Sequence, residues 1–368
     1  MLTQRVLQFA SRIKMSRYFS RKYSNLKAYT PGEQPKDQQY IKLNTNESPF
    51  SPPESVIRAV TEEARRLQLY SDPECTPLII KCAEYFGVAK EQILMTNGSD
   101  EILNFAFMAF CDKEHPVAFP DITYGFYPVF AEINGIPYEK IPLKDDFTID
   151  YRDYVGISKN IVIANPNAPT GIALSLSEVE AIVAGNPDNV VIIDEAYVDF
   201  GAESAVKLVD KYDNLVVTQT FSKSRSLAGA RLGFAIASSA LIADMNTIKY
   251  STNPYNVNRM TMMAGYHALA EDEYFKKCIK NIKQNREYTA LELRKLGFLV
   301  LDSKANFVFA KNDKISGEEL YLKLKAEGIL VRHFALDRIK DFNRITIGTR
   351  EQMQAFVVKV KEILGEKL

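Results

Sequence analysis

The organisation of this chain follows from one segment, Thr218-Gln-Thr-Phe-Ser-Lys-Ser-Arg-Ser-Leu-Ala-Gly-Ala-Arg-Leu-Gly-Phe234. The apolar residues at 215–217 predict a buried strand, after which Ser222 and Lys223 stand in a polar turn. A lysine just past a strand end can lie at the carboxyl edge of a sheet, where desolvation lowers the pKa of its amine and permits a Schiff base with a carbonyl group. Arg231 follows, and a guanidinium near a serine hydroxyl can bind phosphate. Taken alone, a surface lysine in a loop is the commoner explanation.

A carboxylate upstream changes this interpretation. Val190-Val-Ile-Ile193 predicts a strand, and Asp194-Glu-Ala-Tyr197 follows at its end. The chain between Asp194 and Lys223 is long enough to contain a helix that connects two parallel strands. A carboxylate there can keep the pyridine nitrogen of pyridoxal phosphate protonated, which makes the ring an electron sink. A helix N-cap is the simpler explanation of Asp194, but caps explain the combined pattern of aspartate, serine-lysine and arginine poorly.

Further motifs extend this pattern over residues 24–368. In chain order they are Leu26-Lys-Ala-Tyr-Thr-Pro-Gly-Glu33, Lys42-Leu-Asn-Thr-Asn-Glu-Ser-Pro49, Asn97-Gly-Ser-Asp-Glu101, Thr123-Tyr-Gly-Phe-Tyr127, Asn165-Pro-Asn-Ala-Pro-Thr-Gly171, Asp194-Glu-Ala-Tyr197, the lysine segment, Pro254-Tyr-Asn-Val-Asn258, Ala305-Asn-Phe307 and Arg344-Ile-Thr-Ile-Gly-Thr349. Together they resemble the fold-type I, pyridoxal-phosphate-dependent aminotransferases, and within that class the histidinol-phosphate aminotransferases.

The pattern of apolar segments predicts an α/β fold. Strands are expected at 92–95, 117–119, 161–164, 190–193, 215–217 and 233–237, with helices between several of them. This alternation predicts a doubly wound, mostly parallel sheet. Beyond residue 254 the pattern changes to long helices, at 255–270 and 272–296, and then to short strands with helices, which indicates a smaller α+β domain. We therefore expect a large cofactor-binding domain over 50–260, a small domain over 24–49 and 261–368, and a basic extension over 1–23.

Composition excludes several classes of function. Lys and Arg number 46, as do Asp and Glu, so nothing indicates nucleic acid or an anionic membrane as a partner. The longest apolar run, at 105–111, is too short to span a bilayer. The cysteines form no Cys-x-x-Cys pair and the three histidines are scattered, so we expect no metal site. Such cysteines are typical of reduced thiols in a cytoplasmic protein.

The first 25 residues are basic and contain no acid. This composition is similar to a mitochondrial presequence. The alternative is a short extension before an internal start at Met15, followed by a basic arm. We prefer the second interpretation because the family resemblance begins just after Met15.

The resemblance implies pyridoxal 5'-phosphate as the cofactor and assigns the groups around its ring. Lys223 is the implied attachment point, and it also moves a proton between the substrate Cα and the cofactor. Asp194 pairs with the ring nitrogen, and Tyr197 donates to the phenolic oxygen of the ring. Asn167 is expected to assist Tyr197, because Ala168 stands where many relatives have asparagine.

The resemblance also assigns the ring face and the phosphate. Tyr124 is expected to stack on the ring, although an ordinary core aromatic is the alternative. The strand, glycine turn and helix start around 96–100 form an anion site, for which a simple N-cap is the alternative. Tyr70 is the residue implied to reach the phosphate from a neighbouring subunit, so we expect a homodimer. The remaining cofactor-binding residues are Gly98, Ser99, Asp100, Thr220, Ser222 and Arg231.

The substrate-binding residues implied by the resemblance are Tyr29, Asn46, Arg332 and Arg344. Arg344 is expected to bind the substrate anion through its planar fork, while Tyr29 and Arg332 supply further donors to a phosphate. Solvated charges at strand ends are the alternative for the two arginines.

The implied reaction exchanges an amino group between L-histidinol phosphate and 2-oxoglutarate, in histidine biosynthesis. A threonine-phosphate decarboxylase or an aromatic amino acid aminotransferase of the same fold would share nearly every cofactor contact. A non-catalytic regulator of this fold is a further alternative, but it should carry a DNA-binding module, for which the chain has no spare length.

Overall fold

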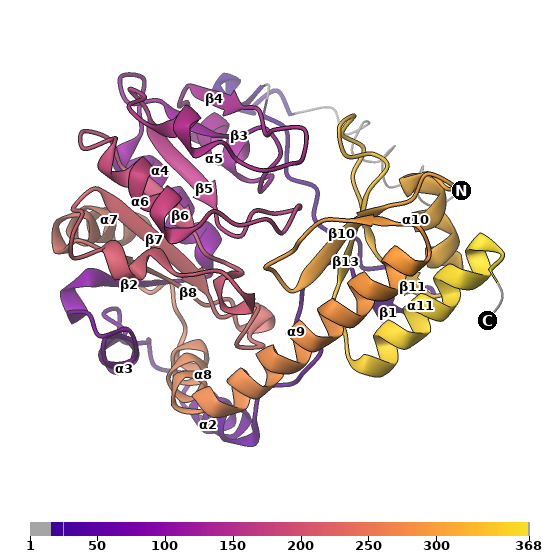
Figure 1. The fold of residues 1–368 in the computed structure, drawn as a ribbon. Coiled ribbons are helices and arrows are strands. Elements are labelled where there is room, and N and C mark those ends of the chain that lie inside the picture. The colour runs from indigo at the N-terminus through magenta and orange to yellow at the C-terminus, as the bar shows by residue number, and fades with distance from the viewer. Residues whose placement is uncertain (1–15, 25, 367–368) are drawn as a thin grey trace.

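The computed structural model describes residues 16–24 and 26–366, so most of the predicted extension over residues 1–23, including the proposed start at Met15, lies outside the described residues. Two bodies of structure are visible in Figure 1, one built on a large sheet and one on a small sheet, with the long helix α9 (Asp272–Lys295) running between them.

The large sheet contains seven strands in the order β2-β8-β7-β6-β5-β3-β4. β7, β6, β5, β3 and β4 run parallel to one another, whereas β8 runs antiparallel to both β2 and β7, between which it lies. The predicted mostly parallel α/β sheet is therefore confirmed. The strands are β2 Ile93–Thr96, β3 Val117–Pro120, β4 Tyr138–Ile141, β5 Asn160–Ala164, β6 Val191–Asp194, β7 Leu215–Thr220 and β8 Gly233–Ala237.

Helices cover both faces of this sheet, which explains why its central strands are apolar throughout rather than alternating. Ile161 and Ile163 of β5 face a core formed with α3, α6 and α8, while Val162 and Ala164 face a core formed with α4, α5 and α7. The helices on the large sheet are α2 Glu54–Ala64, α3 Thr76–Phe86, α4 Ser99–Phe110, α5 Tyr127–Asn134, α6 Leu176–Ala184, α7 Ser239–Thr252 and α8 Arg259–Ala270.

The smaller body is an antiparallel sheet in the order β12-β13-β10-β9, packed against helices with its own core. The parallel pair β1–β11 lies beside it, so β1 of the N-terminal segment pairs with a strand of this body. Its elements are β1 Ile41–Lys42, β9 Leu299–Val300, β10 Phe307–Lys311, α10 Gly317–Ala326, β11 Ile329–Leu330, β12 Arg332–His333, β13 Asn343–Thr346 and α11 Arg350–Leu364.

The transition between the two bodies lies later in the chain than residue 260. Helix α8 packs against α2 and α3, and Met262 and Leu269 belong to the core under the large sheet. Phe275, in the first turns of α9, still belongs to that core. Helix α8 also begins later than the expected residue 255, because the Asn258 side chain accepts a hydrogen bond from the Thr261 amide and caps the helix there.

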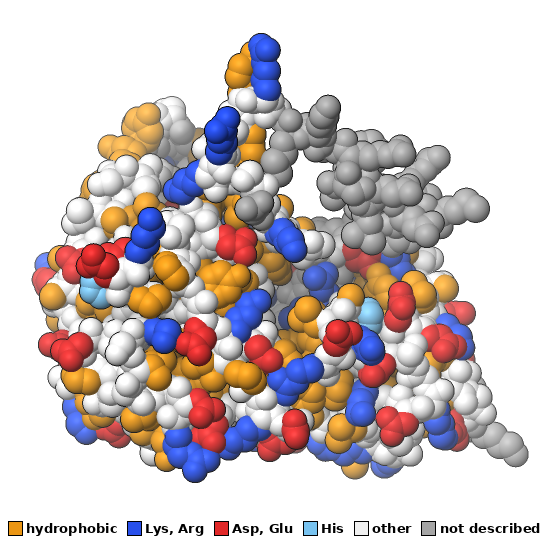
Figure 2. Space-filling model, turned by 90° about the horizontal axis from the view of Figure 1, so that it is seen from above, with side chains coloured by type: hydrophobic (Ala, Val, Ile, Leu, Met, Phe, Trp, Pro, Cys, Tyr) orange, Lys and Arg blue, Asp and Glu red, His pale blue; other side chains and the backbone are white. Residues whose placement is uncertain are grey.

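The surface carries charges of both signs, in agreement with the balanced composition. On the face shown in Figure 2, acidic and basic side chains of the described residues are interspersed over the main body, whereas the projection at the top shows basic ones only. None of the helices in the described part of the chain combines the length and the apolar character needed to cross a bilayer.

Candidate active site

Two adjoining cavities lie at the carboxyl ends of the parallel strands, where ligands bind in open α/β sheets. The smaller, of about 270 Å³, is lined by residues at the ends of β5, β6 and β7 and at the start of α4. The larger, of about 450 Å³, extends toward β12 and β13. Five residues line both cavities and form the passage between them, and these are Thr45, Tyr124, Ala168, Tyr197 and Lys223.

Lys223 lies in this passage, in the turn that follows β7. Its Nζ donates a hydrogen bond to the Thr45 carbonyl over 3.2 Å and lies 5.8 Å from the centre of the Tyr197 ring. Removal from bulk water, with the positive charge of Arg344 as a further cause, lowers the pKa of Lys223 to about 8. A larger fraction of this amine is therefore neutral near physiological pH than in an ordinary lysine, and the neutral form is the nucleophile toward a carbonyl.

Asp194 ends β6 and lies at the floor of the smaller cavity. One oxygen accepts a hydrogen bond from the Tyr127 hydroxyl over 2.8 Å, and the other accepts from the Ala196 amide over 3.2 Å. Burial raises the pKa of Asp194 to about 6, and the Tyr127 hydrogen bond opposes this shift. Because burial destabilises the charged form of this carboxylate, a cationic group beside it would be favoured. Sequence reasoning missed the role of Tyr127, since a buried tyrosine in a helix shows no sign of its hydrogen-bond partner.

The opposite end of the smaller cavity is suited to an anion. Gly98, with φ of 84°, precedes α4, and a side chain there would place its Cβ 2.7 Å from Arg231 Nη2. A Cβ on Gly233 would lie 2.5 Å from the Ser99 amide nitrogen. The two glycines therefore permit Arg231 and the N-terminus of α4 to approach each other closely. Arg231 also donates to Asp100 over 3.2 Å.

These features together fit pyridoxal 5'-phosphate. The helix N-terminus and the Arg231 guanidinium suit its phosphate, the floor carboxylate suits its ring nitrogen, and Lys223 suits its aldehyde. Two hydroxyls in hydrogen-bond contact over 2.9 Å also line the phosphate end, those of Thr220 and Ser222.

Two tyrosines lie at the passage between the cavities. Tyr124 donates its hydroxyl hydrogen to Asp100 over 2.7 Å, which fixes its ring at the cavity wall. The Tyr197 hydroxyl accepts a hydrogen bond from Asn46 Nδ2 over 2.9 Å. Asn46 adopts a left-handed backbone conformation, and its backbone N–H donates a hydrogen bond to the side-chain hydroxyl of Thr346 in β13. Asn46 therefore connects Tyr197 to the smaller body.

Asn167 is the residue for which the structure departs from the sequence expectation. Its amide nitrogen donates to the Ile122 carbonyl over 2.9 Å, and its oxygen accepts from the Thr123 hydroxyl over 2.8 Å. Asn167 is buried and lines neither cavity, whereas its neighbour Ala168 lines both. The expected contact of the Asn167 side chain with the cofactor ring is thus not supported, because loop contacts occupy both ends of its amide.

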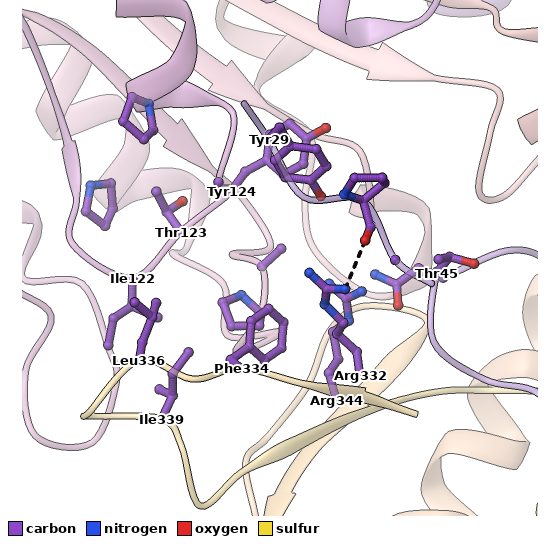
Figure 3. Close-up of a pocket in the computed structure, with 18 of the residues that line it drawn as sticks. Tyr29, Thr45, Ile122, Thr123, Tyr124, Arg332, Phe334, Leu336, Ile339 and Arg344 are labelled. Atoms are coloured by element: carbon purple, nitrogen blue, oxygen red, sulfur yellow. Dashed lines mark hydrogen bonds between the residues drawn. The ribbon is translucent and has the colours of Figure 1, made fainter. Parts of the chain in front are cut away.

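The larger cavity has a cationic end formed by Arg332 and Arg344, which are directly paired across β12 and β13. Arg344 donates to the Asn44 carbonyl over 3.0 Å, and its buried Nε has no hydrogen-bond partner among the residues that the structure describes. Burial also lowers the pKa of Arg344. Figure 3 shows both guanidinium groups at the cavity below Tyr29, whose ring lies 4.1 Å from the Phe126 ring. Two adjacent guanidinium groups facing one cavity favour the binding of an anion there.

The other side of the larger cavity is apolar, as Figure 3 shows. Ile122 comes from the large sheet, and Phe334, Leu336 and Ile339 come from the loop between β12 and β13. Sequence reasoning missed all four residues, because loop residues show no periodicity that indicates which side chains face a cavity.

Tyr70 lies outside both cavities of its own chain. Its side chain is 80% exposed, and its ring stacks on the ring of Tyr255 at 4.7 Å. Arg259 donates a hydrogen bond to the Tyr70 carbonyl over 2.9 Å and holds the backbone at this point. The Tyr70 ring is therefore both exposed and held in one orientation, so another chain could contact it.

Comparisons with known proteins agree with this geometry. Residues 38–360 match the model of the family described as aminotransferase class I and II. A histidinol-phosphate aminotransferase from Brachyspira hyodysenteriae is 51% identical over 352 residues, which covers 95% of this chain and 99% of that protein. One from Clostridium acetobutylicum is 45% identical and covers 95% of this chain and 100% of that protein.

Solved structures show the same likeness. A putative histidinol-phosphate aminotransferase from Erwinia carotovora atroseptica superposes with a TM-score of 0.82 at 26% identity, covering 89% of this chain and 96% of that one. The enzyme from Sinorhizobium meliloti, solved with pyridoxal-5'-phosphate, superposes with a TM-score of 0.81 at 23% identity, covering 89% of this chain and 92% of that one. The second likeness concerns the fold alone.

Proposed function

Because the chain belongs to the class I and II aminotransferase family, we propose that it exchanges an amino group between L-histidinol phosphate and 2-oxoglutarate, a step of histidine biosynthesis. The observation that carries the substrate assignment is the pair Arg332–Arg344 beside Tyr29, in a cavity that opens onto Lys223. The names of the relatives support the same substrate.

Each active-site group then has a defined task. Pyridoxal 5'-phosphate, when bound, withdraws electrons from the carbon that bears the amine and so makes its proton acidic. Lys223 would take that proton from the substrate Cα and return it to the cofactor carbon bonded to the same nitrogen, which its position between the two cavities permits. Asp194 supplies the negative charge beside the ring nitrogen, and Tyr127 holds this carboxylate in place.

One cavity must accept two unlike substrates. Glutamate carries a carboxylate on the carbon that bears its amine, whereas histidinol phosphate carries a phosphate ester on a neighbouring carbon. Both amines would displace Lys223 from the same cofactor carbon, so their anions would occupy overlapping space near Arg344. The phosphate is larger and more negative, and Tyr29 and Arg332 are the additional donors within reach of that space.

Two substitutions test this division of tasks. Arg344→Lys should impair both half-reactions, because an ammonium cannot reproduce a planar fork, and a lost charged hydrogen bond costs about 1.5–3 kcal/mol. We therefore expect kcat/KM to fall roughly 10- to 150-fold for glutamate and for histidinol phosphate. Tyr29→Phe should reduce kcat/KM for histidinol phosphate about 10-fold and affect glutamate less.

The measurement is steady-state kinetics of each half-reaction, with Tyr40→Phe as a control, since the Tyr40 hydroxyl contacts only Asp37 among the described residues and lines neither cavity. Equal losses for both substrates in Tyr29→Phe, or none in either, would contradict phosphate recognition by Tyr29 and favour an aromatic aminotransferase.

The function itself is tested by one assay with three amines. Purified protein loaded with cofactor is given histidinol phosphate, phenylalanine or threonine phosphate, and keto acid and carbon dioxide are measured. Amino transfer fastest from histidinol phosphate supports the proposal. Release of carbon dioxide from threonine phosphate would identify the decarboxylase, and preference for phenylalanine the aromatic aminotransferase. A protein without any turnover would fit a regulator.

We further propose that the enzyme is a homodimer in which Tyr70 reaches the cofactor phosphate of the partner. This assignment is supported by the exposed ring of Tyr70 and by its backbone contact with Arg259. We place the enzyme in the cytoplasm, in keeping with its four free, buried cysteines.

Hybrid dimers test the contribution of Tyr70. Tyr70→Phe should weaken cofactor retention about 10-fold, the cost of a charge-assisted hydrogen bond, with little change in fold. Mixing Tyr70→Phe with Lys223→Ala protomers should produce hybrids with one intact site, because both lesions then fall in the other site. Activity of the mixture no greater than that of the parent dimers, or a fully active monomer in sedimentation, would exclude the assignment.

A further inference from the structure

The loop between β12 and β13 links the two ends of the larger cavity. β12 carries Arg332 and β13 carries Arg344, so the cationic end of the cavity stands on the two strands of one hairpin. The loop itself, at 334–342, supplies the apolar side through Phe334, Leu336 and Ile339. The position of this hairpin over Lys223 therefore sets the shape of the substrate site.

The tip of the hairpin is fastened to the large sheet by Arg338. Its Nη1 donates to Asp121 Oδ2 over 2.9 Å, just past β3. Its Nη2 donates to the carbonyls of Leu143 and Lys144 over 2.9 and 3.0 Å, just past β4. The guanidinium carbon also lies 5.7 Å from the centre of the Phe147 ring. One side chain thus contacts the ends of two strands of the other body.

The segments after β3 and β4 that contact Arg338 are also bonded to each other. Asp121 Oδ1 accepts a hydrogen bond from the Leu143 amide over 2.9 Å, so the carboxylate joins the segments after β3 and β4 before it meets Arg338. Beside this contact, Ile122 and Leu143 of the large body pack with Ile339 and Phe342 of the hairpin in one apolar cluster. The ion pair and the cluster together form a single contact between the bodies, at the rim of the larger cavity.

We propose that Arg338 is a positioning residue for substrate binding, because it fixes the hairpin that carries Arg332, Arg344 and the apolar side of the cavity. Arg338 lines neither cavity and touches no reacting group. The smaller cavity is built from residues between 45 and 231 and contains none from the hairpin. Loss of Arg338 therefore affects the substrate site and spares the cofactor site.

The test compares Arg338→Ala and Arg338→Lys with Lys340→Ala. Lys340 stands on the same loop, its side chain is 57% exposed, and its nearest carboxylate is Asp337 at 3.7 Å. In Arg338→Ala we expect KM for glutamate and for histidinol phosphate to rise about 5- to 30-fold, in line with the loss of several partly exposed hydrogen bonds. Arg338→Lys should lie between Arg338→Ala and the unaltered enzyme, and Lys340→Ala should match the unaltered enzyme.

Two readouts separate positioning from a general loss of stability. The dissociation constant of pyridoxal 5'-phosphate should stay within about 2-fold in Arg338→Ala, because independent sites do not couple. Amide hydrogen exchange of Ile339 and Phe342, whose amides bond within the loop, should accelerate. Weakened cofactor binding in parallel with KM, an unchanged KM, or an equal effect of Lys340→Ala would overturn the proposal.

The proposal does not depend on the identity of the amine. An unaltered enzyme that turns over glutamate but not histidinol phosphate contradicts the proposed function. Arg338 is then still tested by KM for glutamate, by cofactor binding and by hydrogen exchange.

Discussion

Lys223→Ala is expected to reduce amino transfer by about 10⁴-fold, the upper range for loss of a positioned general acid–base group. No neighbouring amine can replace it, because Lys223 is the only lysine that lines the smaller cavity among the residues the structure describes. The measurement is single-turnover transfer from glutamate, and a small exogenous amine should restore part of the rate. The variant should still bind the cofactor without a covalent bond, because the phosphate end of the cavity remains intact.

The attachment itself is tested by borohydride reduction of the cofactor-loaded protein, followed by digestion. The label should appear on one peptide that contains Lys223, and Lys207→Ala, a surface substitution, should behave as the unaltered enzyme. A label outside residues 220–226, or near-normal activity of Lys223→Ala, would end the assignment.

Asp194→Asn should reduce transfer roughly 10²- to 10³-fold, the effect expected when one member of a buried charge pair is neutralised. Asparagine retains the shape, and its oxygen can still accept the hydrogen bond from Tyr127, although the longer bond from the Ala196 amide is lost, so the effect reports mainly the charge. The measurement is the single-turnover rate, with Asp337→Asn as the matched control, since that side chain is 99% exposed.

The cofactor-free protein offers an independent readout of the same residue. The pKa of Asp194 is raised to about 6, so the folded state binds more protons than the unfolded state between about pH 4 and pH 6. The contribution of Asp194 to stability therefore falls as the pH rises through this window. Cofactor-free Asp194→Asn should gain in melting temperature relative to the unaltered protein from pH 4 to pH 7. A difference that is constant with pH would contradict a buried, raised-pKa carboxylate.

Much of the large sheet was predictable because burial on both faces makes its strands continuously apolar. Segments such as Val191–Asp194 and Leu215–Thr220 are uniformly buried; the first was predicted to within one residue at each end, and the second from its correct start but three residues too short. Strand β4 was missed, since Tyr138, Glu139 and Lys140 are exposed at the sheet edge and lack an apolar run. The antiparallel direction of β8 was equally hidden, because strand direction is set by connections and pairing, which residue patterns do not encode.

The site was predictable where a motif lies at a strand end and unpredictable where tertiary contacts orient a side chain. Lys223, Asp194 and Arg231 follow buried strands or glycines, and the structure brings them to one cavity. Asn167 lies in an equally recognisable motif, but its amide turns into the loop instead. Arg338 has no signal in the sequence at all, since an arginine in a polar loop is most often solvated.

The union of β1 with the C-terminal half has a consequence for synthesis of the protein. The Asn46 amide bonds to Thr346 across 300 residues of chain, and β1 pairs with β11. At translation rates of about 5–20 residues per second, that distance corresponds to roughly 15–60 s on the ribosome. For most of that time β11 has not been synthesised, so β1, which precedes Thr45, has no strand to pair with. The large sheet can assemble earlier, but its active site is completed only after Thr346 of β13 has been synthesised.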